Sequence, residues 1–155
     1  MLIVSAFPGL GKTYLGDKFR KDYFDRDFHE TRSLAGVNPV LKNELVELFA
    51  KTIITQYVAD TYKAIFITDY WPILEKVLSY DVIRDFVYVA PDTNDNEFME
   101  QYKDRIIKRS GYPFYSDIVE PRLNDMPMVT EYLSYRRADI RYADSDHPYL
   151  SDIIR

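Results

Sequence analysis

The sequence predicts an α/β fold in which helices cover both faces of a five-stranded parallel sheet. Short, mostly apolar runs alternate along the chain with longer stretches in which apolar residues recur at helical spacing. The clearest runs, at residues 2–5, 64–68 and 86–90, are typical of strands whose two faces are both buried. Ligands of such folds bind at the carboxyl ends of the strands. The residues that follow each run are therefore the first candidates for a functional site.

The expected elements follow one another in a regular order. A helix is expected from residue 12 to about 22, and a polar, irregular segment occupies residues 28–37. Asn38 and Pro39 mark the start of the longest helix, because Asn is a favoured N-cap and proline is favoured at the first helical position. Strands are expected at residues 2–5, 23–25, 64–68, 86–90 and 138–142. Helices are expected at residues 12–22, 38–61, 72–78, 96–109, 116–123, 128–136 and 148–154, with prolines interrupting the pair at 116–123 and 128–136.

Length, charge and cysteine content limit the classes of function. A chain of 155 residues supports one domain, and 20 Lys and Arg against 25 Asp and Glu give a net charge of -5. An acidic chain makes nucleic acid and anionic membranes poor partners. Cysteine is absent, which excludes disulfides and thiolate metal sites. No uncharged segment approaches the roughly 18 residues of a membrane span, and the apolar start lacks a basic leader and a cleavage site. We expect one soluble, cytoplasmic domain over residues 1–155.

The turn after the first expected strand has the pattern of a phosphate-binding loop. Gly9, Gly11, Lys12 and Thr13 stand in the order that such a loop needs: glycines for unusual dihedral angles, a lysine for the outer phosphates and a hydroxyl for magnesium. The first position is Ala6 where glycine is usual, and a methyl group is tolerable there if the residue stays extended. We expect the nucleotide to be bound by Pro8, Gly9, Leu10, Gly11, Lys12, Thr13 and Tyr14.

The alternative for this loop is a chance turn in which Lys12 is a solvated residue of the first helical turn. A lysine at a helix N-terminus opposes the helix dipole unless an anion also lies there, which favours the phosphate site. We expect the Lys12 side chain to face solvent and to carry catalysis.

Acidic residues follow two of the expected strands. Asp25 and Asp27 are two positions apart, so in an extended stretch they face the same way. One of them could order magnesium-bound water while the other orients an acceptor hydroxyl, or both could belong to a solvated turn. Asp69 closes the strand at 64–68, in the manner of a magnesium-binding carboxylate or of an N-cap for the next helix. We expect Thr13 and Asp25 to serve the metal.

A basic cluster lies near the end of the helix at 96–109. Arg105, Lys108 and Arg109 are spaced i, i+3 and i+4 and share one helix face. Cations on a movable segment can close over a transferred phosphoryl group, so residues 100–125 are a candidate lid. The alternative is a cationic cap that pairs with the helix dipole. Arg122 and the pair Arg136 and Arg137 are weaker candidates for substrate contacts.

Several of these stretches together resemble the small P-loop kinases, often encoded by phages, that act on nucleotides or nucleoside monophosphates. The resemblance rests on the stretches "AFPGLGKTYL", "DRD", "AIFIT", "FVYVAPD", "YKDRIIKRSG" and "HPYLSDII", which cover nearly the whole chain in order. It implies a P-loop NTPase fold of the nucleotide-kinase type. In related kinases an Asp-x-Asp after the second strand serves magnesium and substrate, which maps onto Asp25 and Asp27. The lid arginines map onto Arg105 and Arg109.

The resulting functional prediction is a kinase that uses ATP and Mg²⁺ and transfers the γ-phosphate to a (deoxy)nucleoside monophosphate. Lys12, Asp25, Asp27, Arg105 and Arg109 are the expected catalytic residues, and Lys108 is expected to contact the nucleotide. One alternative is a kinase of another hydroxyl acceptor, such as a nucleoside or a polynucleotide 5′ end, although an acidic chain weakens the latter. Another is a nucleotide-binding module without turnover that acts through a protein partner. A homodimer is left open.

Overall fold

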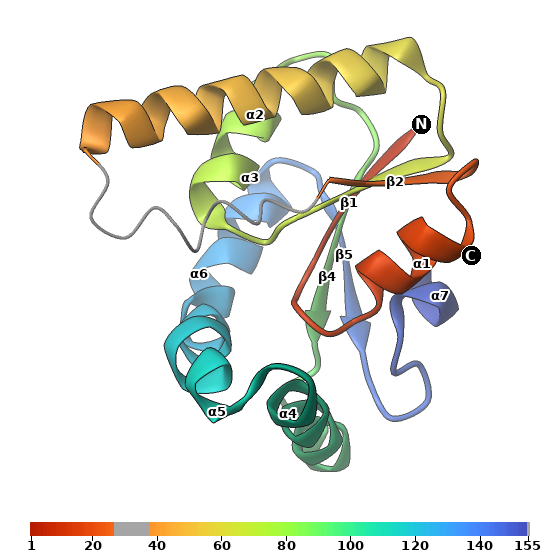
Figure 1. The fold of residues 1–155 in the computed structure, drawn as a ribbon, viewed down its shortest axis with the longest axis vertical. Helices are drawn as coiled ribbons and strands as arrows, with labels where there is room; N and C mark the ends of the chain where they lie inside the picture. Colours follow the sequence, from red (N-terminus) through yellow and green to blue (C-terminus); the bar gives the residue numbers. More distant parts are fainter. Residues whose placement is uncertain (27–37, 155) are drawn as a thin grey trace.

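The computed structural model describes residues 1–26 and 38–154, and these form a five-stranded parallel sheet flanked by helices (Figure 1). The strand order is β2-β3-β1-β4-β5, and every neighbouring pair is parallel. The strands are β1 (Leu2–Ala6), β2 (Tyr23–Arg26), β3 (Ala64–Ile67), β4 (Phe86–Pro91) and β5 (Asp139–Ala143). The α/β class and the parallel sheet predicted from the sequence are confirmed.

The helices connect the strands and cover both faces of the sheet. They are α1 (Lys12–Lys18), α2 (Pro39–Ala59), α3 (Trp71–Leu78), α4 (Asn96–Ser110), α5 (Tyr112–Phe114), α6 (Glu120–Tyr135) and α7 (Leu150–Ile153), with a π-helical segment η2 (Tyr115–Val119) between α5 and α6. Asp25 of β2 contacts α1, whereas the next residue, Arg26, lies over the Phe49 ring of α2. Successive strand residues point to opposite faces, so α1 and α2 cover opposite sides of the sheet.

The core is built on the three central strands. All residues of β3 and β4 are buried, as are the last four of β1, and this explains why these runs show no polar alternation. Ala6 ends β1, pairs in register with Val89 and is fully buried. It is not among the described residues with positive φ, so the condition under which its methyl group is tolerable, an extended backbone, is met.

Two helix predictions need correction. The helix expected at residues 12–22 ends at Lys18, because Phe19 leaves helical geometry and the chain turns back into β2. The two helices expected around 116–123 and 128–136 are instead η2 followed by one continuous α6. Pro121 lies in the first turn of α6, directly after the π-helical segment η2. Pro127 lies inside α6, which continues because Met126, Val129 and Leu133 bury one face of it.

Among residues 1–26 and 38–154, no helix combines the length and the apolar character required to cross a bilayer.

Candidate functional site

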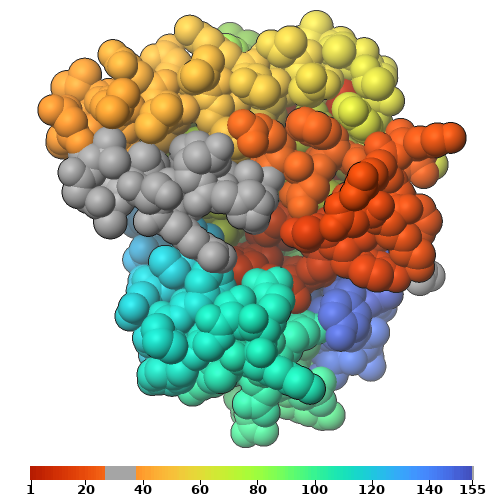
Figure 2. Space-filling model, in the orientation of Figure 1, coloured from red at the N-terminus to blue at the C-terminus, as the bar shows by residue number. Residues whose placement is uncertain are grey.

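A cavity of about 610 Å³ lies at the carboxyl edge of the central strands. Its walls come from the loop between β1 and α1, the residues after β3, the end of α4, and the segment from α5 to α6. Figure 2 shows this side of the molecule, where the surface is hollowed between the red N-terminal segment and the cyan segment of α5 and α6. Parallel α/β sheets bind their ligands at the carboxyl ends of the strands, and the cavity lies there. Most of the site residues predicted from the sequence line it.

The loop between β1 and α1 is held in an unusual conformation. Gly9 and Gly11 have φ values of 78° and 101°, a region that side chains disfavour. A Cβ on Gly9 would lie 2.3 Å from Cδ1 of Ile106, whereas one on Gly11 would meet no atom within 4 Å. The hydroxyl of Tyr102 donates a 2.8 Å hydrogen bond to the carbonyl of Pro8. Helix α4 therefore packs directly against this loop.

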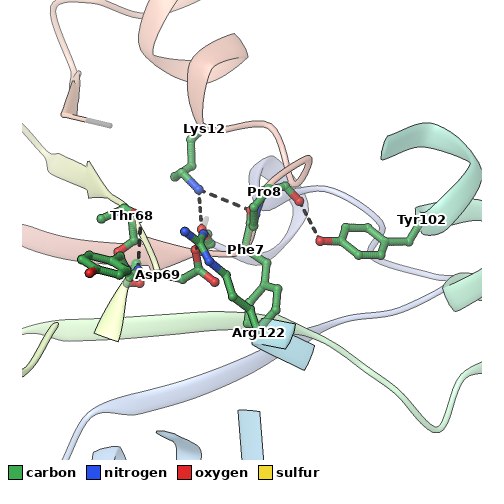
Figure 3. Close-up of polar contacts among 10 residues, drawn as sticks. Phe7, Pro8, Lys12, Thr68, Asp69, Tyr102 and Arg122 are labelled. Carbon is green, nitrogen blue, oxygen red and sulfur yellow. Dashed lines mark hydrogen bonds and ion pairs between the residues drawn. The ribbon is translucent and has the colours of Figure 1, made fainter. Parts of the chain in front are cut away.

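Lys12 is mostly buried, with 8 % of its surface exposed, and so the expectation that it faces solvent was wrong. Its ammonium group donates hydrogen bonds to the carbonyl oxygens of Ala6 and Phe7, the latter at 3.3 Å (Figure 3). These bonds satisfy a charge that would otherwise be costly to bury. Lys12 therefore both lines the cavity and hydrogen-bonds the carbonyls at the start of the loop.

Asp69 follows β3 and pairs directly with Arg122 of α6, and both residues line the cavity (Figure 3). The Asp69 side chain is 2 % exposed and that of Arg122 is 22 % exposed. The turn that carries Asp69 is fixed by the Ser5 hydroxyl, which donates to the carbonyl of Thr68 at 3.0 Å. The N-cap of α3 is Tyr70, so the N-cap alternative for Asp69 was wrong and the carboxylate belongs to the cavity.

The charge of Asp69 acts on the tyrosines beneath the cavity. Burial is the main cause that raises the pKa of Tyr88 well above its ordinary value, and the negative charge of Asp69 adds to it while Arg122 opposes it. The pKa of Tyr102 is raised by the same two causes, with Arg105 opposing. Both phenols are therefore neutral at physiological pH and act as hydrogen-bonding groups rather than as charges.

The basic cluster of α4 divides between the cavity and the outer surface. Arg105 and Arg109 line the cavity, whereas Lys108 is exposed and does not. The Arg105 guanidinium lies over the Tyr149 ring at 4.6 Å from its centroid and reaches the carbonyl of Pro148 at 3.4 Å. The prediction that Lys108 joins the two arginines at one anion therefore needs correction, since only Arg105 and Arg109 reach the cavity.

The two residues predicted to bind the metal, Thr13 and Asp25, do not both line the cavity. Thr13 is exposed and lines the cavity, but Asp25 does not line it. Asp25 lies within β2, which β3 separates from β1, and a Cβ on Gly16 of α1 would lie 2.6 Å from the Asp25 Cβ. Thr13 and Gly16 are three positions apart on one helix face, so Asp25 packs one turn away from Thr13. Asp27 falls outside the described residues.

A second cavity of about 500 Å³ adjoins the first. Gly11 and Tyr14 line both cavities. The second is completed by Leu10, Leu15, Tyr149 and Ser151. The Leu10 side chain is fully buried and its carbonyl accepts a 2.8 Å hydrogen bond from the N–H of Leu150. Leu10 therefore ties the loop to α7 as well as lining this cavity.

The sequence reasoning missed the aromatic and acidic residues of the main cavity. Trp71 and Tyr70 lie directly after Asp69, Tyr88 lies inside β4, and Phe114, Asp117 and Asp125 come from the segment between α4 and the middle of α6. For Tyr70 and Trp71 a signal existed, because they follow a strand. The others depend on how the helical segment after α4 folds over the sheet.

Within the described parts of the chain, no group of three or more His, Asp or Glu side chains is placed to hold a metal ion. Comparisons of the chain with protein-family models, with curated proteins and with solved structures find no match. Function therefore has to be inferred from the chemistry of the two cavities.

Proposed function

We propose that the protein is a P-loop phosphotransferase that uses ATP and Mg²⁺ and transfers the γ-phosphate to a (deoxy)nucleoside monophosphate. The observation that carries the proposal is that one cavity contains Lys12, Thr13, Arg105 and Arg109 together with the carboxylate of Asp69. Phosphoryl transfer depends mainly on positioning and on cationic neutralisation of the moving group, and this set of side chains supplies both.

The loop end of the cavity suits the triphosphate of the donor. Gly11 has open space where a side chain would be, which lets a phosphate approach the backbone closely. The Lys12 ammonium can exchange a loop carbonyl for a phosphate oxygen without leaving its position. The adjoining cavity, with the rings of Tyr14 and Tyr149 at its walls, is a suitable place for the nucleobase.

The oxygen donors at this end also suit Mg²⁺. Kinase magnesium sites use one or two protein oxygens, with the remaining ligands supplied by phosphates and water, so a preformed cluster of three carboxylates is not required. The Thr13 hydroxyl and the Asp69 carboxylate would hold the ion, with Asp25 as a more distant partner behind α1. When bound, magnesium neutralises charge on the phosphate oxygens.

The other end of the cavity suits a planar, anionic acceptor. Trp71 and Phe114 offer aromatic surface for a base, and Arg122 offers a cation for its phosphate. An oxygen of the acceptor phosphate would attack the γ-phosphorus, the bond to the β–γ bridging oxygen would break, and ADP would leave with that oxygen. An ionised phosphate oxygen carries no proton, so this acceptor requires no general base. Lys12, Arg105 and Arg109 would stabilise the charge in transit.

The test is transfer of labelled γ-phosphate from ATP to a panel of nucleoside monophosphates, nucleosides and DNA 5′ ends. The wild type is expected to phosphorylate at least one monophosphate, and Lys12→Ala is expected to lower kcat by about 10²-fold or more, the scale of losing one preorganised charge. Activity only on nucleosides or DNA ends would keep the kinase and replace the acceptor class. Tight ATP binding without any transfer would favour the non-catalytic nucleotide-binding module.

A further inference from the structure

The cavity holds two separate groups of cations. Lys12 begins α1, and Arg105 and Arg109 come from α4. Among the described residues that line the cavity, Arg122 of α6 is the cation outside these two elements. Its partner, Asp69, follows β3, the strand next to β1, and so lies at the same edge of the sheet as the loop. The pair therefore connects the acceptor end of the cavity with its donor end.

The two partners differ in how far they can be reached from the cavity. Asp69 is almost fully enclosed, whereas about a fifth of the Arg122 side chain is open, at 22 % exposure. Arg122 meets the Asp69 carboxylate through Nη1, and a guanidinium carries five N–H donors in all. Arg122 can therefore accept an anion from the cavity side while it still faces Asp69.

We propose that the Asp69–Arg122 pair makes the binding of an anionic acceptor and of Mg²⁺–nucleotide mutually favourable. This inference rests on the proposed phosphotransferase function. Without ligands each side chain neutralises the other. An acceptor phosphate bound to Arg122 competes with Asp69 for the positive charge of the guanidinium. The carboxylate of Asp69 is then less neutralised, and it binds Mg²⁺ more favourably. Coupling of this kind is reciprocal, so Mg²⁺–nucleotide must also tighten the acceptor.

Three expectations distinguish this mechanism from a merely structural ion pair. A neutral nucleoside cannot compete with Asp69 for the Arg122 guanidinium, so its binding should not be coupled to that of Mg²⁺–nucleotide. ATP without Mg²⁺ brings no cation to Asp69, so it should show none either. Removing one partner should abolish the coupling but should not weaken the ligand of the other partner, because the remaining group loses one opposite charge that competes with that ligand.

The experiment is calorimetric titration of the protein with a non-hydrolysable ATP analogue and Mg²⁺, with and without a saturating nucleoside monophosphate. For the wild type the affinity is expected to rise about 5-fold or more in the presence of the acceptor. Arg122→Gln should bind Mg²⁺–analogue alone as tightly as the wild type or more tightly, with a coupling factor near 1. Asp69→Asn should bind the monophosphate alone as tightly or more tightly, also with a factor near 1.

Arg136→Gln is the matched control, since it removes the same charge from the exposed end of the same helix. It should keep the wild-type coupling factor. Arg122→Lys, which retains the charge, should keep part of the coupling and guards against misfolding of Arg122→Gln. A wild-type factor near 1, or a factor unchanged in both pair variants, would overturn the inference while leaving the phosphotransferase intact. Failure of the wild type to bind the nucleotide at all would instead reject the proposed function.

Discussion

The hydroxyl of Tyr102 donates to the carbonyl of Pro8 at 2.8 Å, which joins two residues 94 positions apart in the chain. This contact and the packing of Ile106 on Gly9 dock α4 onto the loop between β1 and α1. Arg105 and Arg109 are thus positioned relative to Lys12 by a rigid contact. If part of the candidate lid moves, we expect the motion in residues 112–125 rather than in α4.

The contact between Gly9 and Ile106 can be tested by paired substitution. Gly9→Ala should be destabilising because it combines a strained positive φ, costing about 1 kcal/mol, with a clash against Cδ1 of Ile106. Ile106→Val deletes that Cδ1 atom and alone should cost about 1 kcal/mol. The double variant should be more stable than the sum of the single losses predicts. Denaturant unfolding measures all three, and strict additivity would show that the clash is relieved elsewhere.

The two arginines of α4 should differ from the neighbouring lysine in kinetics. Arg105→Ala and Arg109→Ala should lower kcat far more than they weaken ATP binding, the pattern of an interaction that strengthens in the transition state. Lys108→Ala is the matched control, because Lys108 lies on the same helix turn but is exposed and outside the cavity. Steady-state kinetics measures the loss in kcat, and ATP titration measures the loss in affinity. Equal losses in binding and turnover would mark the arginines as ground-state ligands of ATP.

The first position of the loop motif should tolerate glycine. Ala6 is fully buried at the end of β1 and has no positive φ to relieve, so Ala6→Gly gains nothing in the folded state. It adds conformational freedom to the unfolded chain, and the free energy of unfolding should fall by about 1 kcal/mol. Nucleotide affinity, measured by titration, should remain. Loss of binding in a folded variant would show that the methyl group shapes the site.

Stability should decrease at alkaline pH because of Tyr88 and Tyr102. Burial and the charge of Asp69 raise both pKa values in the folded state above the ordinary 10.0. Below pH 10 both states keep the phenol protons, and the full stability is present. Above it the unfolded chain loses protons that the folded chain retains, so stability falls by about 1.4 kcal/mol per pH unit for each tyrosine.

The same effect gives a test by substitution. Tyr88→Phe should make the slope of unfolding free energy against pH less steep by about 1 kcal/mol per pH unit between about pH 10 and 11, where the unfolded phenol is partly to mostly ionised. Urea unfolding across this interval measures the slope. An unchanged slope would mean that Tyr88 ionises equally well in the folded protein.

The sequence predicted the strands well because buried parallel strands leave a direct mark. The run at 64–68 has the apolar composition that burial on both faces requires, and β3 and β4 agree with their predicted ranges to within one residue. The loop was recognisable for the same kind of reason, since Gly9 and Gly11 are needed for local backbone geometry. Signals that arise within a few residues can be recovered from a single sequence.

The rest of the site depends on contacts between distant segments. Nothing near Arg122 in the sequence indicates that α6 brings it to Asp69, 53 positions away. The burial of Lys12 depends on carbonyl oxygens whose direction follows from the loop conformation. Lys108 was assigned to the site because helical spacing gives a shared face, but spacing does not say which edge of that face meets the cavity.

Gly16 and Asp25 lie so close that a single added carbon atom would have to displace the strand, with 2.6 Å between the Asp25 Cβ and a Cβ on Gly16. The two positions are therefore expected to vary together as the sequence diverges. A relative with alanine or a larger residue at position 16 should carry glycine at position 25, or a β2 strand set further from α1. This pairing offers a criterion for recognising distant homologues whose overall identity is too low to align, and for judging whether they have kept the carboxylate behind α1.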